Sequence, residues 1–358
     1  MDSHPTPRRQ ASRRAVLGAA LGVGATLLGG AAATAEARSA SFGPWRPPGS
    51  GRRRVLLATN EPWGTYHVRP LLTEARRRGW ELIQLVPDLS NIAPEDPVQV
   101  VTPGNAPPAD LLVLNGAEDW PADCARRLRR LPVAAASLAY LPAEEATRAG
   151  EFRGRVRWAS AGSPAEARAF REYLGYRPRV WPVGSPQTDD LPARRPEPNT
   201  VLILTSVTHP DETGGAAPGA ELLLASAARL AESGRRVVVG LHPREDPALW
   251  DDYEISSLAS VEASARVEAA VGIPGSVFPL VAAVGTPIVG CVDPALAVPE
   301  HLLRVCSSTV DDAADVVAAV EQAEPVDART RRDVVGPVGG SARRLFDGWE
   351  RITRRPWR

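Results

Sequence analysis

The feature that most constrains the fold of this chain is an alternation of short β-rich runs with helical stretches. The pattern begins near residue 53, breaks at a proline-rich segment at 186–199, and then restarts. Strands separated by helices are typical of parallel sheets covered by helices on both faces, because parallel neighbours need a crossover connection. The length of 358 residues allows two domains that each bury a core. The sequence therefore predicts an α/β protein with two doubly wound domains that face a cleft.

The expected elements fall into two sets with one pattern. In the first set we expect strands at 54–59, 81–86, 111–115, 133–138, 156–161 and 179–184, and helices at 68–78, 121–130, 143–149 and 164–174. In the second set we expect strands at 200–205, 236–241, 269–273 and 287–292, a weaker strand at 303–306, and helices at 219–233, 276–284, 309–322 and 342–352. Residues 87–109 are proline-rich and non-periodic, which predicts a long loop.

The N-terminus has the composition of a targeting segment. Ser12-Arg13-Arg14-Ala15-Val16-Leu17-Gly18 is followed by an apolar Gly/Ala-rich run and by small-x-small motifs that end at Ala35 and Ala37. This resembles a twin-arginine export signal cleaved after Ala37, which implies a secreted or extracytoplasmic protein. The alternative is an uncleaved membrane anchor, although the run is short and Gly-rich for a span.

These segments suggest a domain organisation. We expect an export signal at 1–37, a flexible lead-in at 38–52, a first Rossmann-like domain at 53–185, a linker at 186–199, a second Rossmann-like domain at 200–340 and a C-terminal helix at 341–358 that packs back.

Composition excludes several kinds of chemistry. All 42 basic residues are arginine, so Schiff-base enzymes, pyridoxal-phosphate enzymes and phosphate-loop nucleotidases, which need a lysine, are excluded. The 42 acidic residues balance the arginines, which does not favour nucleic acid as a partner. The three cysteines are far apart and no Asp-X-Asp occurs, so we expect no metal and no cofactor, while a Cys291 to Cys306 bridge stays open.

Candidate catalytic residues follow the first predicted strand. Residues 60–67 bring Glu61, Trp63 and His67 to the mouth of the first sheet. His67, or Glu61 as second choice, could act as general base on an acceptor hydroxyl. The alternative is that His67 caps a helix and Trp63 packs at a domain interface.

Candidate phosphate ligands follow the strands of the second domain. Thr205, Ser206 and His209 come after its first strand and could bind phosphate oxygens, or could form a polar turn with local capping. After the next strand come His242, which could neutralise a departing phosphate and deliver a proton, and Arg244, which could reach an anion. A structural histidine that holds the loop is the alternative.

A Gly-Ser turn follows the third strand of the second domain. Gly275 allows a close backbone approach, Ser276 offers a hydroxyl, and the N–H groups of the helix start, including that of Val277, could bind an anion. Because serine is also a common helix cap, a Gly-Ser turn alone is weak evidence for an anion site, and its position after the His-Pro loop is what supports that interpretation.

The motifs Val239-Gly240-Leu241-His242-Pro243-Arg244, Pro274-Gly275-Ser276 and Val284-Gly285-Thr286-Pro287-Ile288-Val289, in that order, resemble the GT-B superfamily. Within it the chain looks most like teichoic-acid glycerophosphotransferases and bacterial polysialyltransferases, and less like UDP-N-acetylglucosamine 2-epimerases. The resemblance implies that His242 contacts the donor phosphate as general acid, that Gly275 and Ser276 bind phosphate, and that no metal is needed. Leu280 stands where many UDP-sugar enzymes have a ribose-binding Glu, which favours a CMP- or CDP-linked donor or a site without nucleotide.

The resemblance therefore implies a transferase that moves a glycosyl or alditol-phosphate group from a nucleotide-activated donor to a cell-envelope glycan or polymer. Because such donors are cytoplasmic, an export signal leaves three hypotheses: a transferase anchored at the membrane through its N-terminus, an exported binding protein without transfer activity, or a 2-epimerase-like isomerase.

Overall fold

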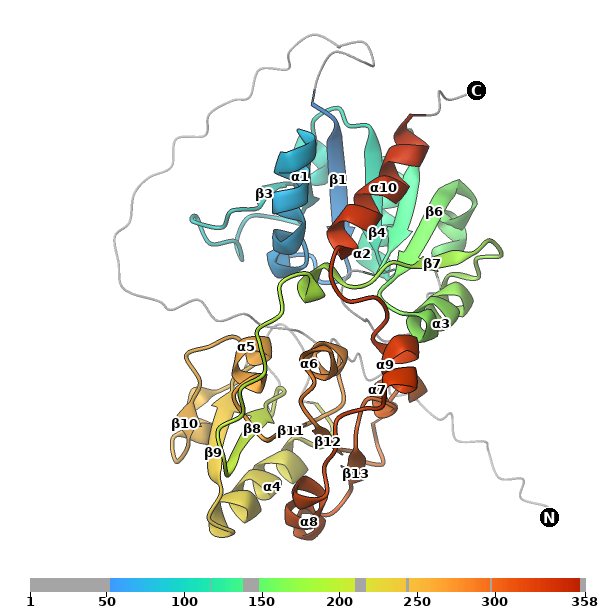
Figure 1. Cartoon of the computed structure of the whole chain (residues 1–358). Helices are drawn as coiled ribbons and strands as arrows, with labels where there is room; N and C mark the ends of the chain where they lie inside the picture. The colour runs from blue at the N-terminus through green and yellow to red at the C-terminus, as the bar shows by residue number, and fades with distance from the viewer. Residues whose placement is uncertain are drawn as a thin grey trace, which may run out of the picture.

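The structure is a computed structural model that describes residues 52–116, 118–137, 148–209, 217–242, 245–296 and 298–354. The expected export signal, the lead-in up to residue 51, most of the helix expected at 143–149, and Arg244 lie outside the described residues. Figure 1 shows two sheet-containing parts stacked one above the other, with the C-terminal helix α10 (Ser341–Thr353) against the upper part.

The first sheet has seven strands, all parallel, in the order β3-β2-β1-β4-β5-β6-β7. Its strands are β1 (Arg54–Thr59), β2 (Glu81–Leu85), β3 (Gln99–Val101), β4 (Leu111–Asn115), β5 (Val133–Ala136), β6 (Val156–Ala161) and β7 (Val180–Pro182). The register follows from pairs such as Val55 with Leu111, both of which are fully buried.

The second sheet has six parallel strands in the order β10-β9-β8-β11-β12-β13. They are β8 (Thr200–Leu204), β9 (Arg236–Gly240), β10 (Glu254–Ile255), β11 (Ala269–Gly272), β12 (Ile288–Cys291) and β13 (Ser308–Val310). Together the two sheets and their helices form the expected α/β architecture of two doubly wound units.

Both sheets reverse their strand order at one point. The chain builds β1, β2 and β3 outward to one side and then returns to place β4 against the other side of β1. It repeats this with β8, β9 and β10, and then places β11 against β8. Loops diverge at such a switch point and leave a crevice at the carboxyl ends of the strands, which is where doubly wound sheets bind ligands.

Helices cover both faces of each sheet. They are α1 (Leu72–Arg78), α2 (Asp119–Arg127), α3 (Pro164–Leu174), α4 (Ala220–Glu232), α5 (Ser260–Ser264), α6 (Phe278–Val284), α7 (Glu300–Leu303), α8 (Val316–Glu321), α9 (Ala328–Val334) and α10. Short 3-10 turns connect them: η1 (Thr65–His67), η2 (Arg69–Leu71), η3 (Pro103–Asn105), η4 (Ala149–Glu151), η5 (Arg153–Arg155), η6 (Pro186–Thr188), η7 (Pro247–Trp250) and η8 (Ala313–Asp315). Within the described ranges no helix is both long and apolar enough to span a membrane.

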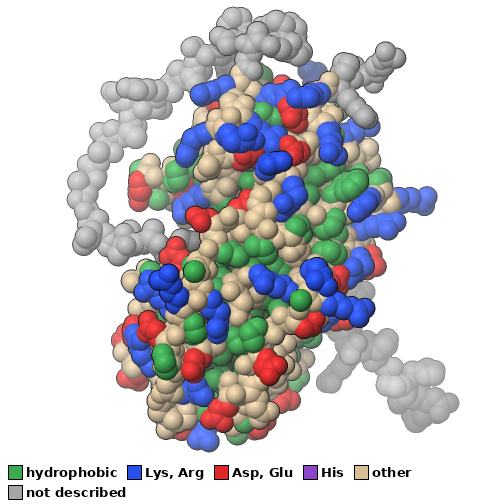
Figure 2. Space-filling view, viewed as in Figure 1, with side chains coloured by type: hydrophobic (Ala, Val, Ile, Leu, Met, Phe, Trp, Pro, Cys, Tyr) green, Lys and Arg blue, Asp and Glu red, His purple; other side chains and the backbone are tan. Residues whose placement is uncertain are grey.

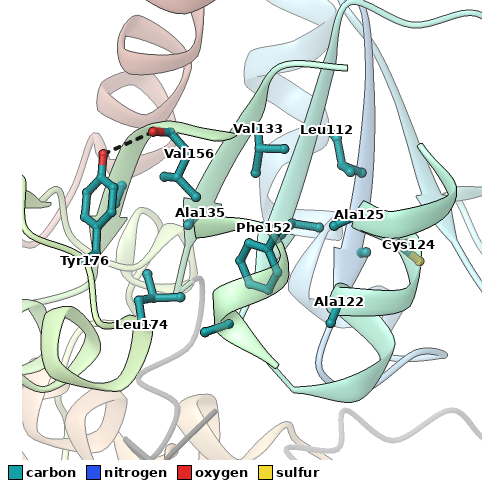
Figure 3. Packing of buried hydrophobic residues seen from close by; sticks show 14 of the residues in the cluster. Leu112, Ala122, Cys124, Ala125, Val133, Ala135, Phe152, Val156, Leu174 and Tyr176 are labelled. Atoms are coloured by element: carbon teal, nitrogen blue, oxygen red, sulfur yellow. Dashed lines mark hydrogen bonds between the residues drawn. The ribbon is translucent and has the colours of Figure 1, made fainter. Parts of the chain in front are cut away.

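Alternate residues of each strand enter opposite cores. Leu56 and Ala58 of β1 pack with α2 and α3, whereas Val55 and Leu57 pack with α1 and α10. Figure 3 shows the first of these cores, where Phe152 fills the space below β5 and the Tyr176 hydroxyl donates to the Val156 carbonyl at 3.4 Å. The second sheet is covered in the same way, by α5, α6 and α9 on one face and by α4 and α8 on the other.

The chain crosses between the two sheets twice, and the crossings are tied together. The Asp189 carboxylate, on the outward crossing, accepts the N–H groups of Ser341 (2.6 Å) and Ala342 (2.8 Å) at the start of α10. Gly184 has φ +87°, and a Cβ there would lie 2.2 Å from the Pro337 carbonyl oxygen, so only glycine fits between the crossings.

This junction leaves the carboxyl edges of the two sheets facing one another (Figure 1). Ala165, just after β6, packs in the core of the second sheet, and η6 contacts both η2, after β1, and α6, after β11. The two switch points therefore open toward the same space.

Several expected elements are wrong in the second half. Residues 303–306, where we expect a strand, form the end of α7 and the turn after it, because Leu302 and Val305 are both buried at helical spacing. The strand of this region is β13, which begins at Ser308. The helix expected at 309–322 is shorter, since the Asp312 carboxylate accepts the Ala314 N–H and α8 begins only at Val316.

Other differences are local. The loop expected at 87–109 contains the edge strand β3, and the helix expected at 68–78 begins as 3-10 turns around Pro70 before α1. Strand β10 and helices α5 and α9 were not expected. The three cysteines are free, so there is no Cys291 to Cys306 bridge.

We predict that Asp189→Ala lowers the free energy of unfolding in urea by about 1 kcal/mol, because α10 loses the acceptor for two of its first N–H groups. Asp190→Ala is the matched control, since Asp190 is also exposed and has no such role. Equal stability of the two variants would contradict the clamp.

Candidate functional site

The expected phosphate-binding residues lie on the loops that follow three adjacent strands, β9, β8 and β11, at the switch point of the second sheet. The structure therefore brings together three segments that lie far apart in the sequence. They are the loop at 205–209, the loop beginning at 241, and the turn at 273–277. All three are at the carboxyl edge that faces the first sheet.

A hydrogen bond joins the first two loops. The main-chain N–H of His242 donates to the Thr205 hydroxyl oxygen at 2.6 Å, and the Thr205 N–H donates to the Gly240 carbonyl at 3.2 Å. The first bond uses a lone pair of the Thr205 oxygen and leaves its O–H as a donor. His242 itself is buried (8% exposed). The backbone of His242 is thus fixed at the base of its loop.

A buried carboxylate makes a second link that sequence reasoning missed. Glu245 is 5% exposed and accepts the Thr208 hydroxyl at 2.7 Å and the Thr208 N–H at 3.3 Å. The Asp246 N–H also donates to it, at 3.0 Å. In the sequence, only the position of Glu245 just after the His-Pro motif indicates that it belongs to the site. Glu245 holds the loops of Thr208 and His242 at a fixed separation.

The third loop presents main-chain donors. Helix α6 begins at Phe278, two residues later than expected, so Gly275, Ser276 and Val277 form a turn. Within the described part of the chain, the N–H groups of these three residues donate to no other group, and neither does the buried Ser276 hydroxyl. Successive N–H groups without protein acceptors are a common way to bind an anion.

The shape of the turn also fits an anion. A Cβ at Gly275 would meet only the Ile273 carbonyl oxygen, at 3.7 Å, so the space beside this backbone is open. Leu280, one turn into α6, is 1% exposed and faces the core. The remaining expected residues are more peripheral: Ser206 is half-buried and His209 is exposed, while Arg244 lies outside the described residues.

The first switch point carries the expected acceptor-side residues. Glu61 is half-buried, and its carboxylate accepts a hydrogen bond from the Tyr66 hydroxyl. His67 is 2% exposed in η1, and burial lowers its pKa to about 3, because the charged imidazolium would lose its hydration. His67 is therefore neutral at physiological pH. Of the two, Glu61 is the more accessible candidate base.

A long loop is fastened next to these residues. The Asp96 carboxylate accepts the Thr65 hydroxyl and the Arg69 guanidinium, both at 2.5 Å, and the Trp63 indole N–H donates to the Asp88 carbonyl at 3.2 Å. Trp63 thus contacts its own domain's loop. The side chain of Asp96 is 4% exposed, so the loop at 86–98 is held firmly over the start of η1.

In the described ranges, no three His, Cys, Asp or Glu side chains gather closely enough to hold a metal ion. The donors at the second switch point are instead main-chain N–H groups and hydroxyls, which suit an oxyanion.

The sequence matches no protein-family model and no curated protein sequence. Solved structures do match. The wall teichoic acid polymerase TagF aligns with a TM-score of 0.56 at 9% identity, over 84% of this chain and 89% of that chain. The UDP-GlcNAc 2-epimerase of Methanocaldococcus jannaschii, in complex with UDP-GlcNAc and UDP, aligns with a TM-score of 0.57 at 14% identity, over 84% and 99%. The calicheamicin glycosyltransferase CalG4 aligns with a TM-score of 0.57 at 16% identity, over 85% and 99%.

The chain has a GT-B fold. The structural alignments, with TM-scores of 0.56 to 0.57, show this fold, and at identities of 9 to 16% they do not show an activity. In the GT-B fold of this chain, the loops of Thr205, His242 and Gly275 lie at the carboxyl edge of the second sheet, and the loop of Glu61 lies at the carboxyl edge of the first.

The neutral state of His67 predicts a pH dependence. The unfolded imidazole takes up a proton below about pH 6.5, whereas the folded one does so only near pH 3. The contribution of neutral His67 to the free energy of unfolding is therefore fully present above pH 6.5. It falls on acidification, by about 2 kcal/mol at pH 5. We expect His67→Gln to flatten the dependence of unfolding free energy on pH between 7 and 5.

His209→Gln, at an exposed histidine, is the control and should leave the slope unchanged. Buried His301, whose pKa burial and the nearby Arg168 and Arg304 lower to about 4, supplies the same sign of slope and should keep part of it in His67→Gln. An unchanged slope in His67→Gln would show that His67 is not buried as described.

Proposed function

We propose that this protein is a transferase that moves a glycosyl or alditol-phosphate group from a nucleotide-activated donor to a glycan or envelope polymer. The observation that carries the proposal is the set of free N–H groups at Gly275, Ser276 and Val277, placed beside the Thr205 and His242 loops at the switch point of the second sheet. An open turn of main-chain donors fits the diphosphate or phosphate of a nucleotide, which brings two or more oxyanions to one place.

The donor side follows from these groups. The three N–H groups and the Ser276 hydroxyl bind the phosphate adjoining the transferred group, and the Thr205 O–H adds a further donor. His242 in its protonated form neutralises the charge that develops on the leaving phosphate and delivers a proton to it. Ser206, His209 and Arg244 are assigned to the outer phosphate oxygens. Since Leu280 faces the core and offers no carboxylate to a ribose, we favour a CMP- or CDP-linked donor over a UDP-linked one.

The acceptor side lies across the space between the sheets. Glu61, with its carboxylate positioned by Tyr66, is the candidate base that takes the proton of an acceptor hydroxyl. His67 supports this loop as a neutral side chain, because an imidazole with a pKa of about 3 is a weak base. Two of the similar solved structures support the proposal: the epimerase was solved with UDP-GlcNAc and UDP, and TagF is a wall teichoic acid polymerase.

The location of the protein is part of the proposal. The sequence favours an export signal that is cleaved after Ala37, but a transferase needs cytoplasmic nucleotide donors. With the proposed activity we therefore infer the alternative, in which the segment stays uncleaved as a membrane anchor. N-terminal sequencing of secreted material tests this: a mature chain that begins at Arg38 outside the cell would remove the anchor and favour an exported binding protein.

Calorimetric titration of the purified protein with CMP, CDP, UDP and UDP-N-acetylglucosamine tests the donor site. We expect CDP or CMP to bind with micromolar affinity. Gly275→Ala should weaken this binding at least about tenfold, equal to about 1.4 kcal/mol, because the new Cβ occupies the space that the phosphate needs.

Gly104→Ala is the matched control. Neither glycine has a positive φ, and a Cβ meets nothing within 4 Å at Gly104 and only one atom at 3.7 Å at Gly275, so both variants should keep wild-type stability within about 0.5 kcal/mol. No binding across the panel by the folded protein would contradict the proposal. Tight binding that Gly275→Ala leaves unchanged would move the site elsewhere.

If transfer is measured, we predict that His242→Ala abolishes it while leaving the fold intact. Ser276→Ala should mainly weaken donor binding, by about 1 to 3 kcal/mol for one lost hydrogen bond to a buried phosphate. Retained turnover in His242→Ala would remove this residue from the mechanism.

A further inference from the structure

Two acidic residues are buried in the part of the chain that the structure describes, Glu166 at 1% exposure and Glu245 at 5%. Other acidic side chains stand at the surface, many of them beside arginines (Figure 2). A carboxylate that is removed from water loses its hydration, and this is costly unless protein donors replace the water. Each of the two buried carboxylates therefore needs a reason in the structure.

The reason for Glu166 is the start of a helix. Its main-chain N–H donates to the Ser163 hydroxyl at 3.1 Å, and its carboxylate accepts the Gly162 N–H, so the residue completes the first turn of α3. The Ser137 hydroxyl, which follows β5, also donates to the carboxylate. These contacts lie within the first domain and serve its fold.

Glu245 instead joins two loops of the candidate site. The Thr208 hydroxyl donates to one carboxylate oxygen at 2.7 Å, and the Thr208 N–H donates to the other at 3.3 Å, so a single residue fixes the plane of the carboxylate. The Asp246 N–H adds a third donor at 3.0 Å. Because these donors come from the protein and the side chain is buried, Glu245 acts on the position of the loops and not on a substrate.

The two loops are bonded at both ends of equal spans. At one end the His242 N–H donates to the Thr205 hydroxyl oxygen at 2.6 Å, and three residues further along each loop Thr208 donates to Glu245. The Glu245 N–H donates to the His242 carbonyl at 3.0 Å and closes the turn between them. Without the carboxylate, the loop of His242 would keep only the first of these two links to its neighbour.

We propose that Glu245 is a positioning residue for the transfer reaction, which with Thr208 fixes the loop of His242 at the donor site. This rests on the proposed function and deepens it by adding a pair of residues that do not contact the donor. Glu245 acts through the geometry of its hydrogen bonds. Its negative charge does not contribute, since a like charge near a phosphate disfavours binding.

Glu245→Gln separates geometry from charge. The amide oxygen can accept the two N–H groups, and the amide NH2 can donate to the Thr208 oxygen, because a hydroxyl accepts as well as donates. In calorimetric titrations of the full chain with CDP, we expect Glu245→Ala to weaken binding at least about tenfold and Glu245→Gln to restore it to within about threefold of the wild type. Binding as weak in Glu245→Gln as in Glu245→Ala would assign the effect to charge and overturn the proposal.

Thr208→Val tests the same link from its other side and does not depend on the folding of Glu245→Ala. It keeps the shape of the side chain and removes the donor, so we expect about fivefold weaker CDP binding, as for one lost hydrogen bond. Thr200→Val is the matched control, because Thr200 is buried at the other end of β8 and donates to the Pro198 carbonyl at 3.3 Å. Equal CDP affinities in the two valine variants would overturn the proposal.

Nuclear magnetic resonance of the full chain labelled with 15N-histidine separates this inference from the proposed function. Without ligand, we expect the imidazole signals of His242, assigned with His242→Gln, to move in Glu245→Ala and Thr208→Val and to stay in place in Glu166→Gln, the control at the other buried carboxylate. If CDP binds and the His242 signals do not move, the positioning role fails and the donor site stands. If the signals move and no nucleotide binds, the transferase proposal fails, and with it the assignment of Glu245 to transfer.

Discussion

The arrangement of the two sheets depends on the junction between them, where the Asp189 carboxylate binds the start of α10. The two bonds from Ser341 and Ala342 join the outward crossing of the chain to its return, and α10 then packs Leu345, Phe346 and other side chains into the first core. Because both crossings are fixed at one point, the carboxyl edges of the two sheets face one another. Every functional argument for this chain depends on that arrangement.

Within this frame the two domains contribute different chemistry. The second switch point offers main-chain N–H groups and hydroxyls, held in position by the Thr205 bond to His242 and by Glu245, and these groups suit oxyanions. The first offers a carboxylate, Glu61, under a loop fastened by Asp96. These two sets of groups are the basis on which we propose separate sites for an anionic donor and a hydroxyl acceptor.

Much of the fold could be predicted from sequence because the central strands are buried on both faces. Strands β1 and β4 are nearly continuous apolar runs, and the predicted bounds of β1, β4 and β6 match the structure. The edge strands β3 and β10 are two or three residues long and partly exposed, so they carry no such signal. At 303–306 the apolar stretch is too short for its periodicity to distinguish a strand from a helix. In the structure, Leu302 and Val305 are buried at helical spacing.

The candidate site divides in a similar way. The loops of Thr205, His242 and Gly275 could be placed from sequence, since they follow recognisable strands. The contact of Glu245 with Thr208 could not, because it joins side chains 37 residues apart through loop geometry. The burial of His67, which removes it as a strong base, depends on how η1 packs and has no sequence signal of its own.

The most direct test of the central claim is hydrogen–deuterium exchange of the full chain with and without saturating CDP. The account predicts slower exchange in peptides covering 205–209, 241–246 and 273–278 together, because the ligand would accept hydrogen bonds from the free N–H groups of Gly275, Ser276 and Val277 and hold the adjoining loops. Protection confined to the first domain, or none at these loops when CDP is bound, would contradict it.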